Sequence, residues 1–542
     1  MLDKQKDKVT YITATIIGVV VFIFLYGLRV LNPCYTDWLL GKGDLSQHYL
    51  GWEFYRKSQW FFPFGLTDQL AYPETTSIIF TDSIPLLAVP FKLLKGILPE
   101  SFQYFGWWGI ICFGLQGYLS AKILRTLGVN RIISAISSLF FVIAPIILYR
   151  MYRHTSLGGQ WIVLLSIYFY VKHNMQYNQV KKMNVQWGCM GVLIAFVHLY
   201  YLPMCGIFAG MYVIRSFVKE KNFRIKYITP IVSFMLGLLL STYLLGGFSS
   251  NARTGSSGLG EFSFNLNGFY NPLGYSKILS NLDLYHVCQA EGMAYLGLGI
   301  LILFVLSLAA ICIKVNKQIA KKIINYIDYA LIILVLVIFA ASPVITYGEH
   351  ILYSIPCSDK IRSCWEVFRS SGREIWSVCY LLMIFAIVGV SRHLQRIKWL
   401  PKFIVILCLG IQMYDLSGVL LSTHNSYKNK QKHELTLNSE FWKEIAERDY
   451  KHVFYAQEGI DISSIFHLAE FALENDMTMN DFYFARIIDR DKQTQEVLNK
   501  PDNQSVYIVL GEQKEEMSEY SNLFWYEEDG FTVGVTEALK AE

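Results

Sequence analysis

Long apolar segments recur through the first 420 residues of the chain. A helix that crosses the hydrocarbon core of a bilayer needs about 20 mostly apolar residues. Segments of this kind predict eleven membrane-spanning helices, at residues 10–31, 102–124, 131–149, 157–172, 184–200, 203–217, 227–246, 293–313, 326–345, 374–391 and 401–420. The apolar run Ile84–Leu98 is shorter and contains Pro85 and Pro90, so it predicts a re-entrant or interfacial segment rather than another span.

From about Leu421 onward the apolar runs are short and are separated by polar residues. They predict helices at Ser439–Arg448, Ile462–Asn475 and Asp491–Leu498, strands at His452–Ala456 and Ser505–Leu510, and a hairpin at Leu523–Thr536 that turns at Asp529-Gly530. Alternating helices and strands favour a small α/β domain. The predicted fold is therefore an all-α polytopic membrane domain over residues 1–420, followed by a soluble α/β domain over residues 421–542.

Composition and charge agree with this division. Of the 542 residues, 53% are apolar and 17% are charged, whereas roughly a quarter of an average soluble domain is charged. The net charge of +5 combines two opposite parts: residues 421–542 carry 12 Lys and Arg against 24 Asp and Glu, and residues 1–420 carry 36 against 19. The composition therefore favours a membrane protein over a cytosolic globular enzyme. We expect the protein to lie in a lipid bilayer and not to bind nucleic acid.

The basic residues also predict an orientation. With the N-terminus inside and residues 84–98 not crossing, the six short cytoplasmic segments carry 22 Lys and Arg in 63 residues, and the four outside segments carry 13 in 151. Cytoplasmic loops of membrane proteins are enriched in Lys and Arg. We therefore expect a multi-pass protein of the bacterial cell membrane, with the N-terminus inside and both the loop 32–101 and the α/β domain outside.

The loop 32–101 contains the first candidate chemistry. If the run from Asp44 is helical, Asp44, Gln47 and His48 share one face, and a carboxylate beside an imidazole is suited to taking a proton from a hydroxyl. An equally acceptable interpretation is an interfacial helix that Asp44 caps. Asp82 leaves two interpretations as well. It either caps the apolar segment that follows it or faces the same cavity as Asp44, in which case the two carboxylates could hold a divalent cation.

Charged residues in the later outside loops are the other candidates. Arg150, Arg153 and His154 lie in one short loop, and Arg369 and Arg373 lead into a predicted span. Outside arginines run against the usual charge bias, so they either are tolerated without a role or bind an anionic ligand. Glu291, which comes shortly before another span, either stabilises a helix dipole or belongs to the same site. Together these residues suggest a cavity that holds a phosphate and activates a hydroxyl.

Several runs of residues, in this order, resemble an uncharacterised bacterial family of multi-pass membrane proteins that is similar to the GT-C superfamily of glycosyltransferases. The runs are Gly43–Trp52, Tyr72-Pro73, Thr81–Leu86, Arg150–His154, Glu291–Gly299 and Arg369–Arg373. The resemblance covers about residues 10–420. It implies transfer of a sugar from a polyprenyl-phosphate carrier to a glycan or lipid acceptor on the outer face, with inversion.

The resemblance also implies roles for individual residues. Asp44 would be the catalytic base, His48 would orient Asp44 or bind the sugar, and the four arginines would pair with the phosphate. The sequence has no Asp-x-Asp pair and no clear Pro-Pro after the loop helix, so dependence on a divalent cation stays open. Two other functions remain as alternatives, namely a transporter or flippase of lipid-linked saccharides and a non-catalytic envelope assembly protein.

Overall fold

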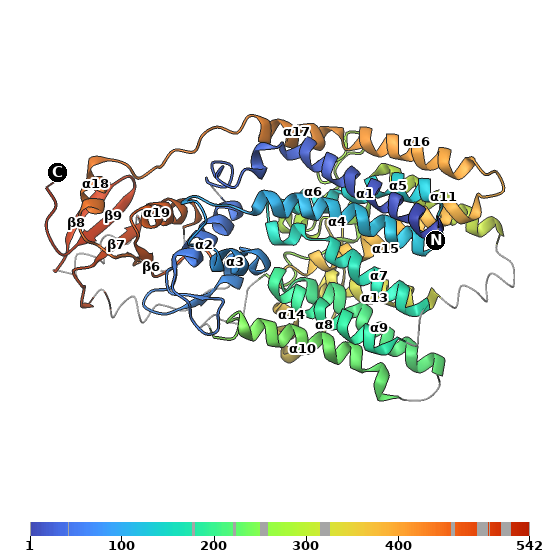
Figure 1. The fold of residues 1–542 in the computed structure, drawn as a ribbon, viewed down its shortest axis with the longest axis horizontal. Helices are drawn as coiled ribbons and strands as arrows, with labels where there is room; N and C mark the ends of the chain where they lie inside the picture. The colour runs from blue at the N-terminus through green and yellow to red at the C-terminus, as the bar shows by residue number, and fades with distance from the viewer. Residues whose placement is uncertain are drawn as a thin grey trace.

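Figure 1 shows the computed structural model of the chain, an elongated molecule with a long helical region and a sheet-containing domain at one end. The structure describes residues 2–41, 43–175, 179–220, 224–249, 258–314, 326–456, 461–484, 497, 499–510 and 522–540. The N-terminus lies at the helical end, far from the sheet.

Each of the eleven predicted apolar segments contains a helix. These helices are α1 (Leu2–Tyr26), α4 (Phe105–Thr126), the pair α5 (Arg131–Val142) and α6 (Pro145–Arg150), α7 (Trp161–Met175), α8 (Val180–Val197), α9 (Tyr201–Glu220), α10 (Thr229–Leu244), α11 (Leu298–Lys314), α13 (Ile327–Ala341), α15 (Trp376–His393) and α16 (Leu400–Asp415). In the described part of the chain, four helical stretches are long and apolar enough to cross a membrane, and a fifth forms if α16 and α17 (Ser417–Lys428), bent by 54°, count as one. The number of crossings therefore stays a prediction.

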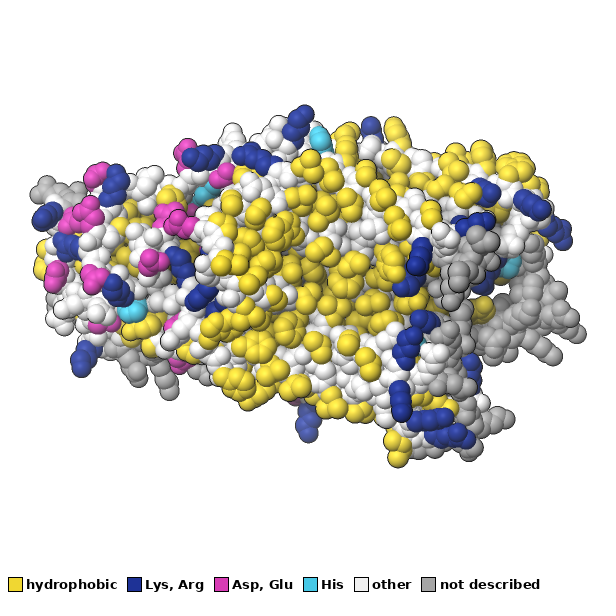
Figure 2. Space-filling view, viewed as in Figure 1, with side chains coloured by type: hydrophobic (Ala, Val, Ile, Leu, Met, Phe, Trp, Pro, Cys, Tyr) yellow, Lys and Arg dark blue, Asp and Glu magenta, His cyan; other side chains and the backbone are white. Residues whose placement is uncertain are grey.

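The surface of the helical region is largely apolar. In Figure 2 apolar side chains cover the middle of the molecule, and acidic side chains gather over the domain at one end. Inside, some helices approach closely. A Cβ added at Gly18 of α1 would stand 2.1 Å from the carbonyl oxygen of Phe113 in α4. Apolar helices with glycine at such contacts are typical of a membrane protein.

The first loop (residues 32–101) forms a small structure of its own between the two parts of the molecule. It contains α2 (Asp44–Lys57), the two-residue strands β1 (Leu66–Thr67) and β2 (Thr76–Ser77), and α3 (Pro85–Leu93). The run from Asp44 is therefore helical, as the spacing of Asp44 and His48 requires. The nine residues of α3 extend only about 14 Å at 1.5 Å per residue, which is too short to cross a bilayer.

The C-terminal domain is built on a five-stranded mixed sheet. Its strands are β5 (His452–Tyr455), β6 (Thr478–Met479), β7 (Ser505–Leu510), β8 (Phe524–Glu528) and β9 (Phe531–Val535), in the order β6-β5-β7-β9-β8, and its helices include α18 (Glu440–Glu447) and α19 (Ile462–Glu474). The small C-terminal sheet region is confirmed. The short strand β6 is an addition to the prediction, and most of the predicted helix Asp491–Leu498 lies outside the described residues.

The C-terminal domain docks on the first loop through its sheet. The Tyr72 amide donates to the Met479 carbonyl at 3.0 Å, and the Met479 amide donates to the Gln69 carbonyl at 2.8 Å, so the loop backbone continues the sheet beyond β6. The Tyr72 ring stacks on His452 at 3.6 Å between centroids. These contacts hold the domain against the loop that carries Asp44.

Candidate functional site

A cavity of about 460 Å³ lies where the helical region, the first loop and the C-terminal domain meet. Its polar lining comes from all three parts: Asp44, Gln47, Asp82, His154, His198, Tyr200, Arg369, Ser370, Arg373 and Tyr483. The remaining wall is apolar and includes Ile79, Phe80, Pro85, Val197, Leu199, Leu202, Phe368 and Phe484. The lining of the cavity therefore combines a group of charged residues with a broad apolar surface.

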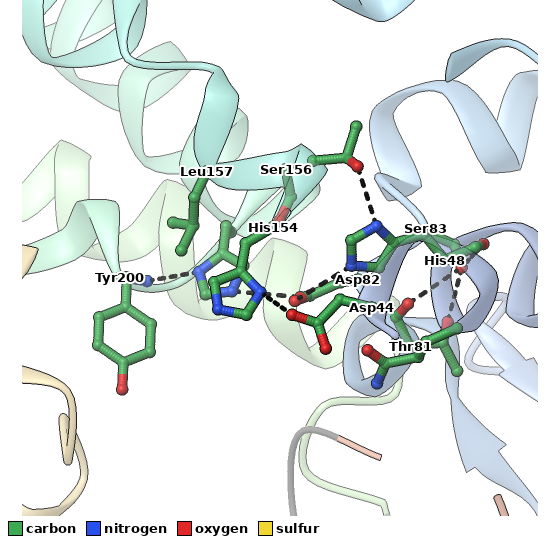
Figure 3. A network of polar contacts seen from close by, with 12 residues as sticks. Asp44, His48, Thr81, Asp82, Ser83, His154, Ser156, Leu157 and Tyr200 are labelled. Atoms are coloured by element: carbon green, nitrogen blue, oxygen red, sulfur yellow. Dashed lines mark hydrogen bonds and ion pairs between the residues drawn. The ribbon is translucent and has the colours of Figure 1, made fainter. Parts of the chain in front are cut away.

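Asp44 begins α2, directly after Gly43, whose φ of 100° allows the sharp entry of the chain into the helix. One oxygen of Asp44, Oδ2, lies 2.6 Å from Nδ1 of His154 (Figure 3). The opposite ring nitrogen, Nε2, lies 2.9 Å from a guanidinium nitrogen of Arg373. Since a guanidinium only donates, Nε2 accepts and Nδ1 carries the proton that His154 donates to Asp44. His154 therefore orients the Asp44 carboxylate, a role that the resemblance had suggested for His48.

The charges at this pair follow from its surroundings. Burial and the nearby Arg373 lower the pKa of His154. Burial has the largest single effect on the pKa of Asp44 and would raise it, but the hydrogen bond from His154 and the electrostatic interactions with His154 and His48 together outweigh burial and hold that pKa below its usual value. At neutral pH the carboxylate is ionised and the imidazole is neutral, which is the state of a carboxylate that can accept a proton.

Asp82 lies between two further histidines. Its Oδ1 is 3.2 Å from Nε2 of His198, and its Oδ2 is 3.9 Å from Nε2 of His48. The other nitrogen of His48, Nδ1, is 3.0 Å from Oγ1 of Thr155. Asp82 was also expected to cap the start of the apolar segment after it, and this interpretation is wrong. Asp82 instead follows the end of the 3-10 helix Ile78–Thr81, with a φ of 54°. The residue that precedes α3 is Ile84.

His48, His154 and Asp82 form a group that could hold a cation. One nitrogen each of His48 and His154 and one oxygen of Asp82 lie within 4.8 Å of one another. Nε2 of His48 is buried and has no hydrogen-bond partner within the described residues, as expected of a nitrogen that coordinates a metal ion. Two imidazoles and a carboxylate suit a divalent ion such as zinc. The cation site expected from the sequence consists of Asp44 and Asp82. In the structure Asp82 belongs to the group, and His48 and His154 take the place of Asp44.

The arginines separate into two kinds. Glu291 Oε2 lies 2.9 Å from Arg150 and 2.6 Å from Arg373, so two of the four are paired with one carboxylate. These cations outweigh the effect of burial and hold the pKa of Glu291 well below its usual range. Glu291 lies before α11 rather than in its first turn, so the helix-dipole interpretation does not apply.

The other two arginines make no ion pair within the described part of the chain. Arg369 lines the cavity, and its guanidinium lies 5.7 Å from the centre of the Phe262 ring. Arg153 does not line it and lies over Tyr149 at 4.7 Å. The structure thus brings Arg369 and Arg373 to the cavity, places Arg150 behind Glu291, and leaves Arg153 outside.

Sequence reasoning missed His198 and Tyr483. His198 follows α8 within the predicted span 184–200, where an ionisable residue in an apolar run is a signal for a functional site. Tyr483 follows β6 in the C-terminal domain, and nothing in the local sequence connects it with residues more than 400 positions earlier. Only the folded structure brings its side chain to the cavity.

Two models of known protein families match the chain. The model of the domain of unknown function DUF6311 matches residues 15–417, and the model of the DUF6311 C-terminal domain matches residues 441–536. The chain belongs to the DUF6311 family. No curated protein matches this DUF6311 chain.

Three solved structures are similar to the chain at low identity. The apo oligosaccharyltransferase of Archaeoglobus fulgidus has 10% identity and a TM-score of 0.45, over 98% of this chain and 75% of that one. ArnT from Cupriavidus metallidurans, bound to undecaprenyl phosphate, has 10% identity and a TM-score of 0.45, over 97% of each chain. The Archaeoglobus enzyme tethered to an acceptor peptide has 11% identity and a TM-score of 0.43, over 97% and 74%.

Proposed function

We propose that this protein is an integral membrane glycosyltransferase of the bacterial cell envelope. It transfers a sugar from a polyprenyl-phosphate carrier to a hydroxyl of a glycan or lipid acceptor on the outer face of the membrane. The observation that carries the proposal is the chain of contacts from Asp44 through His154 to Arg373, which places an ionised carboxylate and a guanidinium in one cavity.

In the proposed reaction Asp44 takes the proton of the acceptor hydroxyl, while His154 holds the carboxylate through Nδ1–H. The acceptor oxygen then forms a bond to the anomeric carbon on the face opposite the phosphate. The bond between that carbon and the phosphate oxygen breaks, and the electron pair leaves with the polyprenyl phosphate. A displacement of this kind inverts the anomeric configuration and needs one base and a cation for the leaving group.

The cation is supplied by the arginines. Arg150 and Arg373 share the single carboxylate of Glu291, so the group keeps one positive charge. Arg369 adds a second at the cavity wall. Guanidinium groups match the geometry of phosphate oxygens. We therefore assign the phosphate to the side of the cavity between Arg369 and Arg373, facing the carboxylate of Asp44.

A divalent cation is not required by this arrangement. His48, Asp82 and His154 would hold the ion, and His154 would then exchange its hydrogen bond with Asp44 or with Arg373 for the metal. When bound, it would help to neutralise the charge that develops on the leaving phosphate.

The proposed orientation places the cavity on the outer side. The C-terminal domain and the first loop, both expected outside, form two of its walls. Domain limits of 1–420 and 421–542 belong to the same proposal, although α17 extends the helical region to Lys428.

The test uses membranes that contain the full chain, incubated with a panel of radiolabelled undecaprenyl-phosphoryl hexoses. We expect wild-type membranes to release undecaprenyl phosphate and to form a new glycoside. Asp44→Asn keeps the size of the side chain and removes the base, so the rate should fall by about 10²- to 10⁴-fold. Glu100→Gln, an exposed carboxylate of the same loop, is the matched control and should keep full activity.

Two results would reject the proposal. One is an Asp44→Asn variant that is as active as the wild type. The other is movement of the lipid-linked sugar across reconstituted vesicles with no glycoside formed, which is the behaviour of a transporter.

A further inference from the structure

The C-terminal domain contributes side chains to the cavity, through the segment Asn480–Phe484 that follows β6. Tyr483 and Phe484 form part of the cavity wall. The Nε2 of Gln47 donates to the Tyr483 carbonyl at 2.5 Å. Because Gln47 lies one helical turn after Asp44 on α2, this bond ties the segment to the helix that carries the candidate base.

The segment is also held from its own side. The side chain of Asn480 accepts from the Tyr455 amide at 2.7 Å and donates to the Tyr455 carbonyl at 3.0 Å, which fixes its start at the ends of β5 and β6. These strands run parallel, and the carboxyl edge of parallel strands is where ligands bind in open α/β sheets. The sheet therefore presents this edge to the cavity.

The aromatic residues of the segment form a packed base. Phe482 is buried, with its ring 6.5 Å from that of Phe54 in α2 and 6.0 Å from that of Phe466 in α19. Phe484 lies 5.9 Å from Phe482, and Tyr483 lies edge-on to Phe466 at 6.1 Å. The flanking rings are held in place on both sides of the interface, so the two that reach the cavity are preorganised.

The environment of the Tyr483 hydroxyl agrees with this position. Burial raises the pKa of Tyr483, and the charge of Asp44 raises it further, while Arg369 acts in the opposite direction. The phenol of Tyr483 therefore interacts electrostatically with Asp44 and Arg369, which also line the cavity. The contacts of Tyr483 that the structure defines are those of its backbone carbonyl and its ring.

We propose that Tyr483 and Phe484 form a carbohydrate subsite, in which a pyranose ring packs on the aromatic surface and bonds through one hydroxyl to the phenol of Tyr483. The proposal rests on the proposed function and gives the C-terminal domain a part in choosing the sugar. A pyranose has apolar C–H faces and a polar rim, and an aromatic ring beside a hydroxyl matches both. The ring belongs either to the donor or to the acceptor.

The experiment compares two short-chain ligands, farnesyl phosphate and a panel of farnesyl-phosphoryl hexoses, by calorimetric titration of the purified full chain in detergent. The gain in affinity that the hexose adds is measured for the wild type, Tyr483→Phe and Phe484→Ala. Phe524→Ala, a half-exposed residue of β8, is the control. Unchanged binding of farnesyl phosphate shows that each variant is folded.

If the donor sugar occupies the subsite, each variant should lose about 3- to 10-fold of affinity for the best hexose ligand and none for farnesyl phosphate. If the acceptor occupies it, donor binding stays unchanged and the apparent KM for a cell-envelope lipid extract rises by a similar factor. If neither quantity changes in either variant, the subsite does not exist. Because binding is measured apart from transfer, a chain that binds the hexose ligand but transfers nothing would reject the glycosyltransferase and not the subsite.

Discussion

The charge cluster around Glu291 allows a prediction about stability. Glu291→Gln keeps the shape of the side chain and removes a negative charge that forms ion pairs with both Arg150 and Arg373. The side chain of Arg150 is 1% exposed. The variant therefore leaves a buried guanidinium without its counterion.

The magnitude follows from this burial. Breaking a buried ion pair by removing one partner costs about 3–5 kcal/mol. The Glu291 side chain is 20% exposed, so solvent screens part of the interaction and we expect about 3 kcal/mol. With an unfolding entropy of about 2.1 cal/mol/K per residue over the roughly 400 residues of the DUF6311 match, this corresponds to a fall in Tm of about 4 °C.

The assay is thermal unfolding of the purified protein in detergent. Asp476→Asn is the matched control, because it removes the carboxylate of the exposed Lys57–Asp476 pair and such pairs contribute about 0–1 kcal/mol. Asp476 has a φ of 53°, and Asn tolerates that conformation as well as Asp does. The control should therefore change the Tm by no more than about 1 °C.

A second substitution separates charge from packing. Arg150→Met in the Glu291→Gln background removes the more deeply buried of the two guanidinium groups that lose Glu291 and should restore part of the lost Tm. An unchanged Tm in Glu291→Gln, or a double variant that is less stable than the single one, would refute the reasoning about the buried charge.

Three further predictions concern the first loop. ZnCl₂ should raise the Tm of the wild type and not that of Asp82→Asn, because a ligand that binds only the folded state stabilises it; equal shifts would exclude this cation site. A Cβ at Gly51 would stand 2.5 Å from the Cβ of Thr81, so Gly51→Ala should displace Asp82, the residue after Thr81. We expect this variant to transfer hexose at least about tenfold more slowly than the wild type. Gly410→Ala is the control and should keep the wild-type rate, because the space around Gly410 is open. Burial raises the pKa of Glu53 from 4.5 to about 7. Between these two values the folded state keeps a proton that the unfolded chain releases, so the stability of the folded state falls as the pH rises. The Tm of the wild type relative to that of Glu53→Gln should therefore fall between about pH 5 and pH 7 and stay constant above pH 7.

Local sequence patterns predicted the apolar helices and most of the secondary structure of the C-terminal domain, but not the short strand β6. A long apolar run predicts a helix, because a segment in lipid has to make all of its backbone hydrogen bonds within itself while its side chains contact the lipid. The hairpin turn at Asp529-Gly530 was predicted in the same way, and both residues have positive φ. The spacing of Asp44 and His48 predicted that α2 would present them on one side.

The partners of these side chains were not accessible from sequence. Asp44 was expected beside His48, four residues away, but its hydrogen bond goes to His154, 110 positions later in the chain. Asp82 meets His198 across a similar separation. No periodicity within one segment specifies which of many histidines will face a given carboxylate, because that depends on how separate helices pack.

By itself, the sequence determined that this is a helical membrane protein with an acidic α/β domain, and it indicated where polar chemistry concentrates. Apolar length, charge bias and turn residues act locally or as sums along the chain, so they can be read without coordinates. The tertiary structure alone decided that Glu291 neutralises two of the candidate arginines and that the C-terminal domain places Tyr483 in the cavity. Ion pairs and cavity walls form between segments hundreds of residues apart, and their geometry exists only when those segments are packed together.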